Sequence, residues 1–128
     1  MATRSKAKAL LRAENKDRRP KAIAKYIRIS PSKVHVVLDL IRGKSYTEAV
    51  AILKTTPKAA CEPVLKCLNS AAANAEVNLG MNKDVLYVAE CFADQGPTLK
   101  RMQPVSRGRG YRILKRTSHI TVILDEME

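Results

Sequence analysis

The first regular alternation of apolar and polar residues in this chain lies between residues 21 and 29, KAIAKYIRI. A period of two predicts a β-strand, with Ile23, Ile27 and Ile29 on one face. Residues 1–19, MATRSKAKALLRAENKDRR, are rich in Lys, Arg and Ala and have too few apolar positions to anchor a helix. We therefore expect a basic flexible tail at residues 1–19, followed by a single domain at residues 20–128.

Two helices are predicted next, because apolar residues recur there at steps of three and four. The first begins at Ser30-Pro31, with serine as the N-cap and proline at the first helical position, where its missing N–H does no harm. The second spans residues 46–55, with Ser45 or Thr47 as its cap. The expected core positions of the first helix are Val34, Val37, Leu38 and Ile41.

A third and longer helix is predicted to end near Gly80. Thr56-Pro57 repeats the cap-and-proline pattern, but Pro63 conflicts with one continuous helix, because an interior proline costs about 3 kcal/mol. We expect a short turn at residues 58–60 and then a main helix starting at or near Pro63. Its expected apolar stripe is Val64, Leu68, Ala72, Ala75 and Leu79.

Strand patterns return after Gly80. One strand is expected to place Leu86, Val88 and Phe92 on a single face. The last strand is expected to place Ile120, Val122 and Leu124 inward, with His119 and Thr121 outward. The order β-α-α-α-β-β predicts an α+β domain, a three-stranded antiparallel sheet with three helices on one face and a long protruding β-hairpin.

The hairpin is predicted at about residues 94–116 and has an unusually long polar connection. Ordinary hairpin loops contain 2–5 residues. If the strands simply continue, the arm from Asp94 to Pro104 spans roughly 33 Å. It lacks any Asp or Glu from Gly96 to Arg116, and its basic residues are Lys100, Arg101, Arg107, Arg109, Arg112, Lys115 and Arg116. Such a projection is expected inside a polyanion, because like charges repel in water.

The overall charge supports this expectation. The net charge is +12, and it is segregated: residues 1–44 carry +10, residues 45–96 carry −2 and residues 97–128 carry +4. This segregation indicates nucleic acid as the partner, with an anionic membrane surface as the weaker interpretation. No apolar stretch approaches 18 residues and no signal-peptide centre is present, so no membrane insertion is expected.

The sequence offers little for catalysis. Cys61, Cys67 and Cys91 form no C-x-x-C pair and are expected to be small buried residues in a reducing cytosol. His35 is expected at the surface or against RNA, and His119 as a polar residue with its hydrogen bonds satisfied. We expect no catalytic residue, no metal and no cofactor.

Binding chemistry is better supported. The arginines of the hairpin offer two-point contacts to phosphate, and Tyr111 offers a stacking surface. A second basic patch is expected around the first strand and helix, formed by Arg18, Arg19, Lys21, Arg28, Lys33, Arg42 and Lys44. An architectural DNA-binding protein remains an alternative, as does an RNA-modifying enzyme, although no cofactor pocket is evident.

Several motifs in a fixed order resemble one known family. They are AKYIRISPSKVHVVLDLIRGK, the TPK segment before Ala59, LNSAAANAEVN, LYVAECFADQGPTLKR and GRGYRILKRTSHITV. Over roughly residues 20–124 the chain resembles the bacterial form of the universal large-subunit ribosomal protein number twenty-two family.

The resemblance implies a cytoplasmic, non-enzymatic constituent of the large ribosomal subunit. Such a protein binds the large-subunit (23S) rRNA, helps assembly, and lines the peptide exit tunnel with its hairpin. Implied partners are rRNA, the nascent polypeptide and large-subunit protein number four, with the chain a monomer within the ribosome. Residues matching the family's rRNA-binding positions include the hairpin cations and, in the domain, Arg28, Ser30, Lys33, Arg42 and Lys44. The implied tunnel-lining tip is Met102, Gln103, Pro104, Val105 and Ser106.

Overall fold

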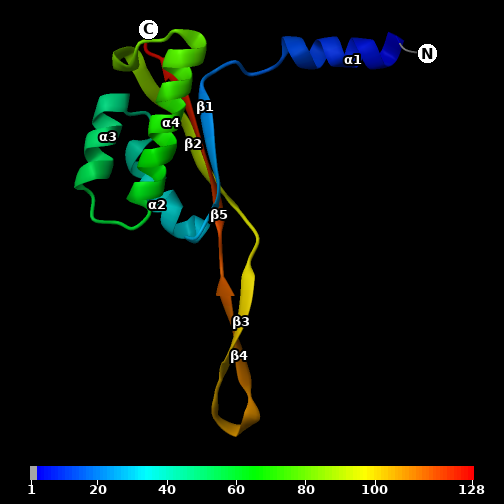
Figure 1. Ribbon diagram of the computed structural model, residues 1–128, viewed down its shortest axis with the longest axis vertical. Coiled ribbons are helices and arrows are strands. Elements are labelled where there is room, and N and C mark those ends of the chain that lie inside the picture. The colour runs from blue at the N-terminus through cyan, green and yellow to red at the C-terminus, as the bar shows by residue number, and fades with distance from the viewer. Residues whose placement is uncertain (1–2) are drawn as a thin grey trace.

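A computed structural model describes residues 3–128 and shows a two-layer α+β domain with a projecting β-ribbon (Figure 1). The helices are α1 (Thr3–Glu14), α2 (Pro31–Ile41), α3 (Tyr46–Thr55) and α4 (Cys61–Leu79), with short 3₁₀ turns η1 (Lys83–Val85) and η2 (Ser106–Gly108). The strands are β1 (Lys21–Ile27), β2 (Leu86–Gln95), β3 (Leu99–Pro104), β4 (Gly110–Lys115) and β5 (Ser118–Glu126). The predicted fold class is confirmed.

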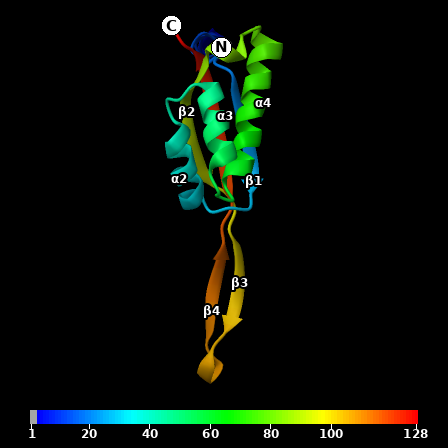
Figure 2. The same cartoon turned by 90° about the vertical axis from the view of Figure 1, so that its left-hand side faces the viewer.

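The main sheet has the order β1-β5-β2, and both outer strands are antiparallel to β5. α4 packs on β1 and β5, α2 packs on β2, and α3 packs against α2 and α4. Figure 2 shows these three helices on one side of the sheet, with the β3–β4 ribbon extending from its lower end. One face of the sheet is therefore covered and the other is open.

The helix starts agree with the sequence signals. Pro31 is the first residue of α2, although the Ser30 side chain makes no capping hydrogen bond. Ser45 caps α3, because its Oγ accepts a hydrogen bond from the Glu48 N–H at 3.4 Å. α4 begins at Cys61, so Pro63 lies in its first turn, where no intrahelical N–H bond is lost.

The core confirms most of the predicted helix positions. The four predicted residues of α2 are at most 1% exposed, and the α4 stripe is buried from Val64 to Ala75. Leu79 is an exception and is 46% exposed, because the last turn of α4 lies beyond the buried part of the helix. Gly80 then ends the helix with a φ of 65°.

A bulge in β1 changes which residues face the core. The register with β5 shifts between Ala24 and Ile27, and Tyr26 has a φ of 59°. Ala22 is buried whereas Ile23 is 50% exposed on the open face. Ile27 packs against the core beyond the bulge. The prediction that Ile23 and Ile27 share a face is therefore wrong.

A second bulge reverses the pattern of β2. The register shifts between Val88 and Glu90, so that Cys91 and Ala93 are buried after it. Phe92 is 38% exposed, and the prediction that it shares a face with Val88 is wrong. In β5 the inward positions are confirmed, although Thr121 on the other face is only 7% exposed.

The N-terminal segment forms helix α1, which has no buried residue. Figure 1 shows this helix extending away from the domain. Expected flexibility of residues 1–19 stays a prediction, and residues 1 and 2 lie outside the described residues. Within residues 3–128, no helix combines the length and apolar character that a bilayer crossing requires.

Candidate nucleic-acid interface

The hairpin is a separate two-stranded ribbon joined to the sheet by a short irregular junction. β2 ends at Gln95 and β3 begins at Leu99. The sheet strand therefore does not continue directly into the ribbon, which differs from the simplest expectation. At the junction the Gly96 N–H donates to the Thr117 carbonyl at 2.8 Å, and the Thr117 hydroxyl donates to the Pro97 carbonyl at 2.6 Å. These two bonds fix the base of the ribbon to the domain.

Basic side chains lie on both faces of the ribbon. Arg101 pairs with Ile113 and Leu99 with Lys115, which places two cations on one face. Lys100 and Arg112 occupy the alternate positions and lie on the opposite face. A ribbon with cations on both faces suits a site enclosed by polyanion better than contact with a single flat surface.

The chain reverses just after Pro104, where the extended arm was expected to end. β3 continues to Pro104, so Met102, Gln103 and Pro104 are strand residues, and the turn covers residues 105–109. The Val105 N–H donates to the Arg109 carbonyl at 3.0 Å. Arg107 and Gly108 both have positive φ, 61° and 69°, which reverses the chain tightly. Within the expected tip, Met102 to Pro104 therefore lie in the strand and Val105 and Ser106 in the turn, where Arg107 and Arg109 join them at the end of the ribbon.

The ribbon cations have no acidic partners in the described chain. Across residues 3–128, none of the seven forms an ion pair, and all seven are exposed. Tyr111 is 67% exposed and Met102 is 65% exposed. Charged and flat side chains are thus free to bind an external partner.

At the base of the ribbon, part of the second basic patch joins the hairpin. A cleft of about 560 Å³ is lined by Arg28, Ile29, Ser30, Ser32, Lys33, Ala59, Ile113, Leu114, Lys115 and Arg116. The sequence predicted cations from both segments but assigned them to two patches. More than eighty residues separate Arg28 from Lys115, and no local pattern reveals that they line one cleft.

The remaining residues of the second patch lie elsewhere. Arg42 is at the far end of α2, where it bonds to Asp39 at 2.6 Å and to the Cys91 carbonyl at 2.9 Å. The bond to Asp39 raises the pKa of Arg42. Lys44 is exposed beyond it, next to β2. The predicted second patch is therefore not one continuous surface.

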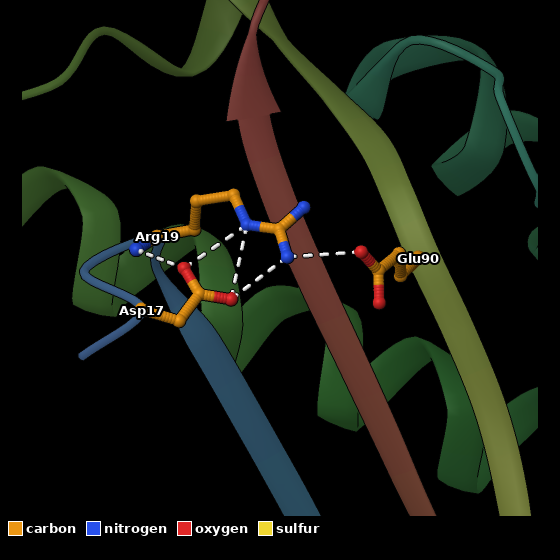
Figure 3. Close-up of polar contacts among 3 residues, drawn as sticks. All are labelled: Asp17, Arg19 and Glu90. Carbon is orange, nitrogen blue, oxygen red and sulfur yellow. Dashed lines mark hydrogen bonds and ion pairs between the residues drawn. The ribbon is translucent and has the colours of Figure 1, made fainter. Parts of the chain in front are cut away.

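Arg19 bridges two segments of the domain. Its guanidinium bonds to Asp17 at 2.7 Å and reaches across β5 to Glu90 on β2 at 2.9 Å (Figure 3). The bond from Arg19 lowers the pKa of Asp17 to about 2, and the same contacts raise the pKa of Arg19. Arg18 and Lys21 are exposed nearby. Arg19 therefore has a structural contact that the sequence did not reveal.

The cysteines and His119, which were considered for catalysis, have structural roles. All three cysteines are buried and free, as predicted, and burial raises the pKa of Cys67 to about 11. His119 Nδ1 accepts a hydrogen bond from the Tyr26 N–H at 3.0 Å, which confirms it as a satisfied polar residue. His35 is exposed. No group of three or more potential metal ligands occurs among the residues from Thr3 onward.

Comparisons with known proteins agree with this arrangement. The family model described as ribosomal protein L22p/L17e matches residues 22–125. The chain is 59% identical to the large ribosomal subunit protein uL22 of Clostridium novyi, over 83% of this chain and 96% of that protein. It is 60% identical to the protein of that name from Desulfitobacterium hafniense, over 83% and 93%, and 61% identical to that from Acetivibrio thermocellus, over 83% and 85%. The chain belongs to the ribosomal protein L22p/L17e family.

Proposed function

We propose that this chain is a structural constituent of the large ribosomal subunit that binds the large-subunit rRNA. It is not an enzyme, and it works in the bacterial cytoplasm. The observation that carries the proposal is the acid-free ribbon, with cations on both faces and at its turn. Membership of the L22p/L17e family supplies the ribosomal context.

Charge neutralisation is the mechanism that the ribbon supports. RNA segments that approach each other repel through their phosphates, and basic side chains placed between them reduce this repulsion. Arg101 and Lys115 face one side of the ribbon while Lys100 and Arg112 face the other. One ribbon can therefore bridge two RNA segments, which is what an assembly protein needs to do.

The turn at the end of the ribbon has a second role, separate from the neutralisation of rRNA phosphates. We place it at the wall of the peptide exit tunnel, beside large-subunit protein number four and the nascent polypeptide. The strand end at Met102, Gln103 and Pro104 and the turn residues Val105, Ser106, Arg107 and Arg109 form this wall segment. The exposure of every residue of β3, and of every residue of β4 except Ile113, supports this placement.

The test replaces Arg101, Arg107, Arg109 and Arg112 with glutamine. For the unmodified chain, log affinity for an rRNA fragment should fall with log salt at a slope near −5 to −6, if about six or seven phosphates are neutralised. The variant should show a much shallower slope and weak binding. Its thermal melt should stay nearly unchanged, because these side chains are exposed and form no ion pair within residues 3–128.

Two outcomes would contradict the proposal. A flat salt response of the unmodified chain would mean that phosphate neutralisation does not drive binding. Tighter binding to duplex DNA than to folded rRNA, in direct competition, would favour an architectural DNA-binding role instead.

A further inference from the structure

The cleft at the base of the ribbon adjoins a second, more apolar hollow. The second hollow measures about 260 Å³ and is lined by Ile29, Lys33, Val36, Lys58, Ala59 and Ala60. It shares Ile29, Lys33 and Ala59 with the larger cleft of about 560 Å³. The two adjacent hollows are together called here the basal groove, which has a cationic part and a more apolar part.

The charge on the basal groove has one sign. Its lining includes Arg28, Lys33, Lys58, Lys115 and Arg116 and no acidic residue. An acid does lie in the neighbouring hollow, but Glu62 is bonded there to Lys66 at 3.0 Å. The cations of the basal groove therefore have no internal counterion among its lining residues, and an anion is the complementary occupant.

The apolar part needs a different occupant from phosphate. Val36 is 57% exposed on α2 and lines the smaller hollow together with Ile29, Ala59 and Ala60. A bare phosphate gains nothing from contact with these side chains. A ligand with a flat apolar face joined to an anion satisfies both parts of the groove at once.

We propose that the basal groove binds one unpaired nucleotide of the rRNA, an inference that rests on the proposed function. The base enters the smaller hollow, and the ribose and its phosphates lie in the larger cleft among the basic side chains. Arg28 and Arg116 offer planar guanidinium groups that bond phosphate in two-point contacts. Paired RNA does not fit this site, because the faces of its bases are already stacked on one another, whereas unpaired bases are free to turn outward.

The position of the groove gives this nucleotide a structural effect. One wall of the cleft is domain, at residues 28–33, and the other is the ribbon, at residues 113–116. A nucleotide held between the two walls contacts both bodies. It therefore adds a second connection beside the Gly96–Thr117 junction and holds the ribbon in its direction relative to the sheet.

The test uses the full chain and three RNA probes: a short oligoadenylate, an abasic ribose-phosphate oligomer of equal length, and an RNA duplex of equal length. Methyl resonances of Ile29, Val36 and Ala59 report on the apolar part in NMR titrations. Oligoadenylate should shift all three in a saturable manner, whereas the abasic oligomer and the duplex should leave them nearly unchanged. Equal shifts with the abasic oligomer or with the duplex would overturn the inference.

A matched pair of variants tests the same point by affinity. Val36→Glu places a carboxylate in the apolar hollow, and Val77→Glu makes the same charge change at a position 80% exposed on α4. Both positions are exposed, so both variants should fold. Val36→Glu should weaken oligoadenylate binding about fivefold or more, because a bound base would bury the new carboxylate in an apolar hollow without a hydrogen-bond partner, and Val77→Glu should weaken it less than about twofold.

Equal loss of oligoadenylate affinity in the two variants would overturn the proposal that the basal groove binds a nucleotide, but not the proposed role of the ribbon. Failure of the four-arginine test would instead overturn the proposed function itself. The two results are independent, because none of the four substituted arginines lines the groove.

Discussion

Replacing Gly96 by alanine tests whether the junction holds the ribbon on the domain. A Cβ at this position would lie 2.5 Å from Thr117 Oγ1 and 3.2 Å from His119 Cε1. The backbone of Gly96 is not in the left-handed region, so alanine can adopt it without strain. Any effect of the substitution therefore comes from the contact of the new methyl group.

The expected loss of stability follows from the hydrogen bond of Thr117 that the new methyl group disrupts. Its hydroxyl donates to the Pro97 carbonyl at 2.6 Å, and Thr117 is only 5% exposed. Moving the hydroxyl leaves a buried polar group unsatisfied, at about 1–3 kcal/mol. Without the clash, Gly→Ala at a compatible site would stabilise by about 0.4–1 kcal/mol. The two effects together predict that Gly96→Ala lowers the free energy of unfolding by about 1–1.5 kcal/mol, and Tm by about 3–7 °C.

Urea denaturation of Gly96→Ala, Thr117→Ala and the double variant supplies the assay. In the double variant the hydroxyl that meets the new methyl group is absent, so its destabilisation should be smaller than the sum of the single effects by about 1 kcal/mol or more. A Gly96→Ala protein that is as stable as the parent, or more stable, would refute the reasoning. Strict additivity would also refute it, because the two positions would then not be in contact.

Three further results are expected. Leu68→Ala, at a site with no exposed surface, should cost about 2–5 kcal/mol in denaturant unfolding. The pKa of Cys67 is raised to about 11 from 9.0, so the contribution of its neutral thiol to folding stability should be complete below pH 9 and lost as the pH rises through 11. Cys67 in the folded protein should therefore resist alkylation at pH 8, and rapid labelling would contradict this. The pKa of Asp17 is lowered to about 2 from 3.8, so its stabilising bond to Arg19 should be complete above pH 3.8 and lost as the pH falls through 2. In Asp17→Asn, the Tm measured in thermal melts should no longer include the fall that protonation of Asp17 causes between pH 3.8 and 2.

The helices were predictable because two independent signals agree. Steps of three and four gave the buried stripe of α2, and Ser30-Pro31 gave its start. The faces of the outer strands were not predictable from a period of two, because each contains a bulge. One extra residue moves every following side chain to the opposite face. This is why Phe92 lies on the open face after the bulge in β2, and why Ile27 packs against the core after the bulge in β1 while Ile23, before it, is exposed.

The ribbon was visible in the sequence because seven cations fall within residues 96–116 without one Asp or Glu. Long-range partners were not visible in the same way. Arg19, whose contact with RNA stays a prediction, bonds to Glu90, which lies 71 residues further along the chain. Arg42 likewise bonds to the Cys91 carbonyl, 49 residues away. The pairing of both β1 and β2 with β5 brings Arg19 to Glu90, and the packing of α2 on β2 brings Arg42 to Cys91.

The order of the ribbon depends on the junction at its base and on the ligand that surrounds it. Every residue of β3 is exposed, and in β4 only Ile113 is half-buried, so no core supports the strands. An isolated two-stranded ribbon is marginally stable in water, and its cross-strand pairs contribute only about 0.2–1 kcal/mol each. In the free protein the Gly96–Thr117 junction is therefore the main constraint on the ribbon. A ligand that binds only the ordered ribbon adds about 2.7 kcal/mol at one hundred times its Kd. Because the ribbon's cations face both sides, enclosing RNA supplies that ligand and also removes the repulsion among them.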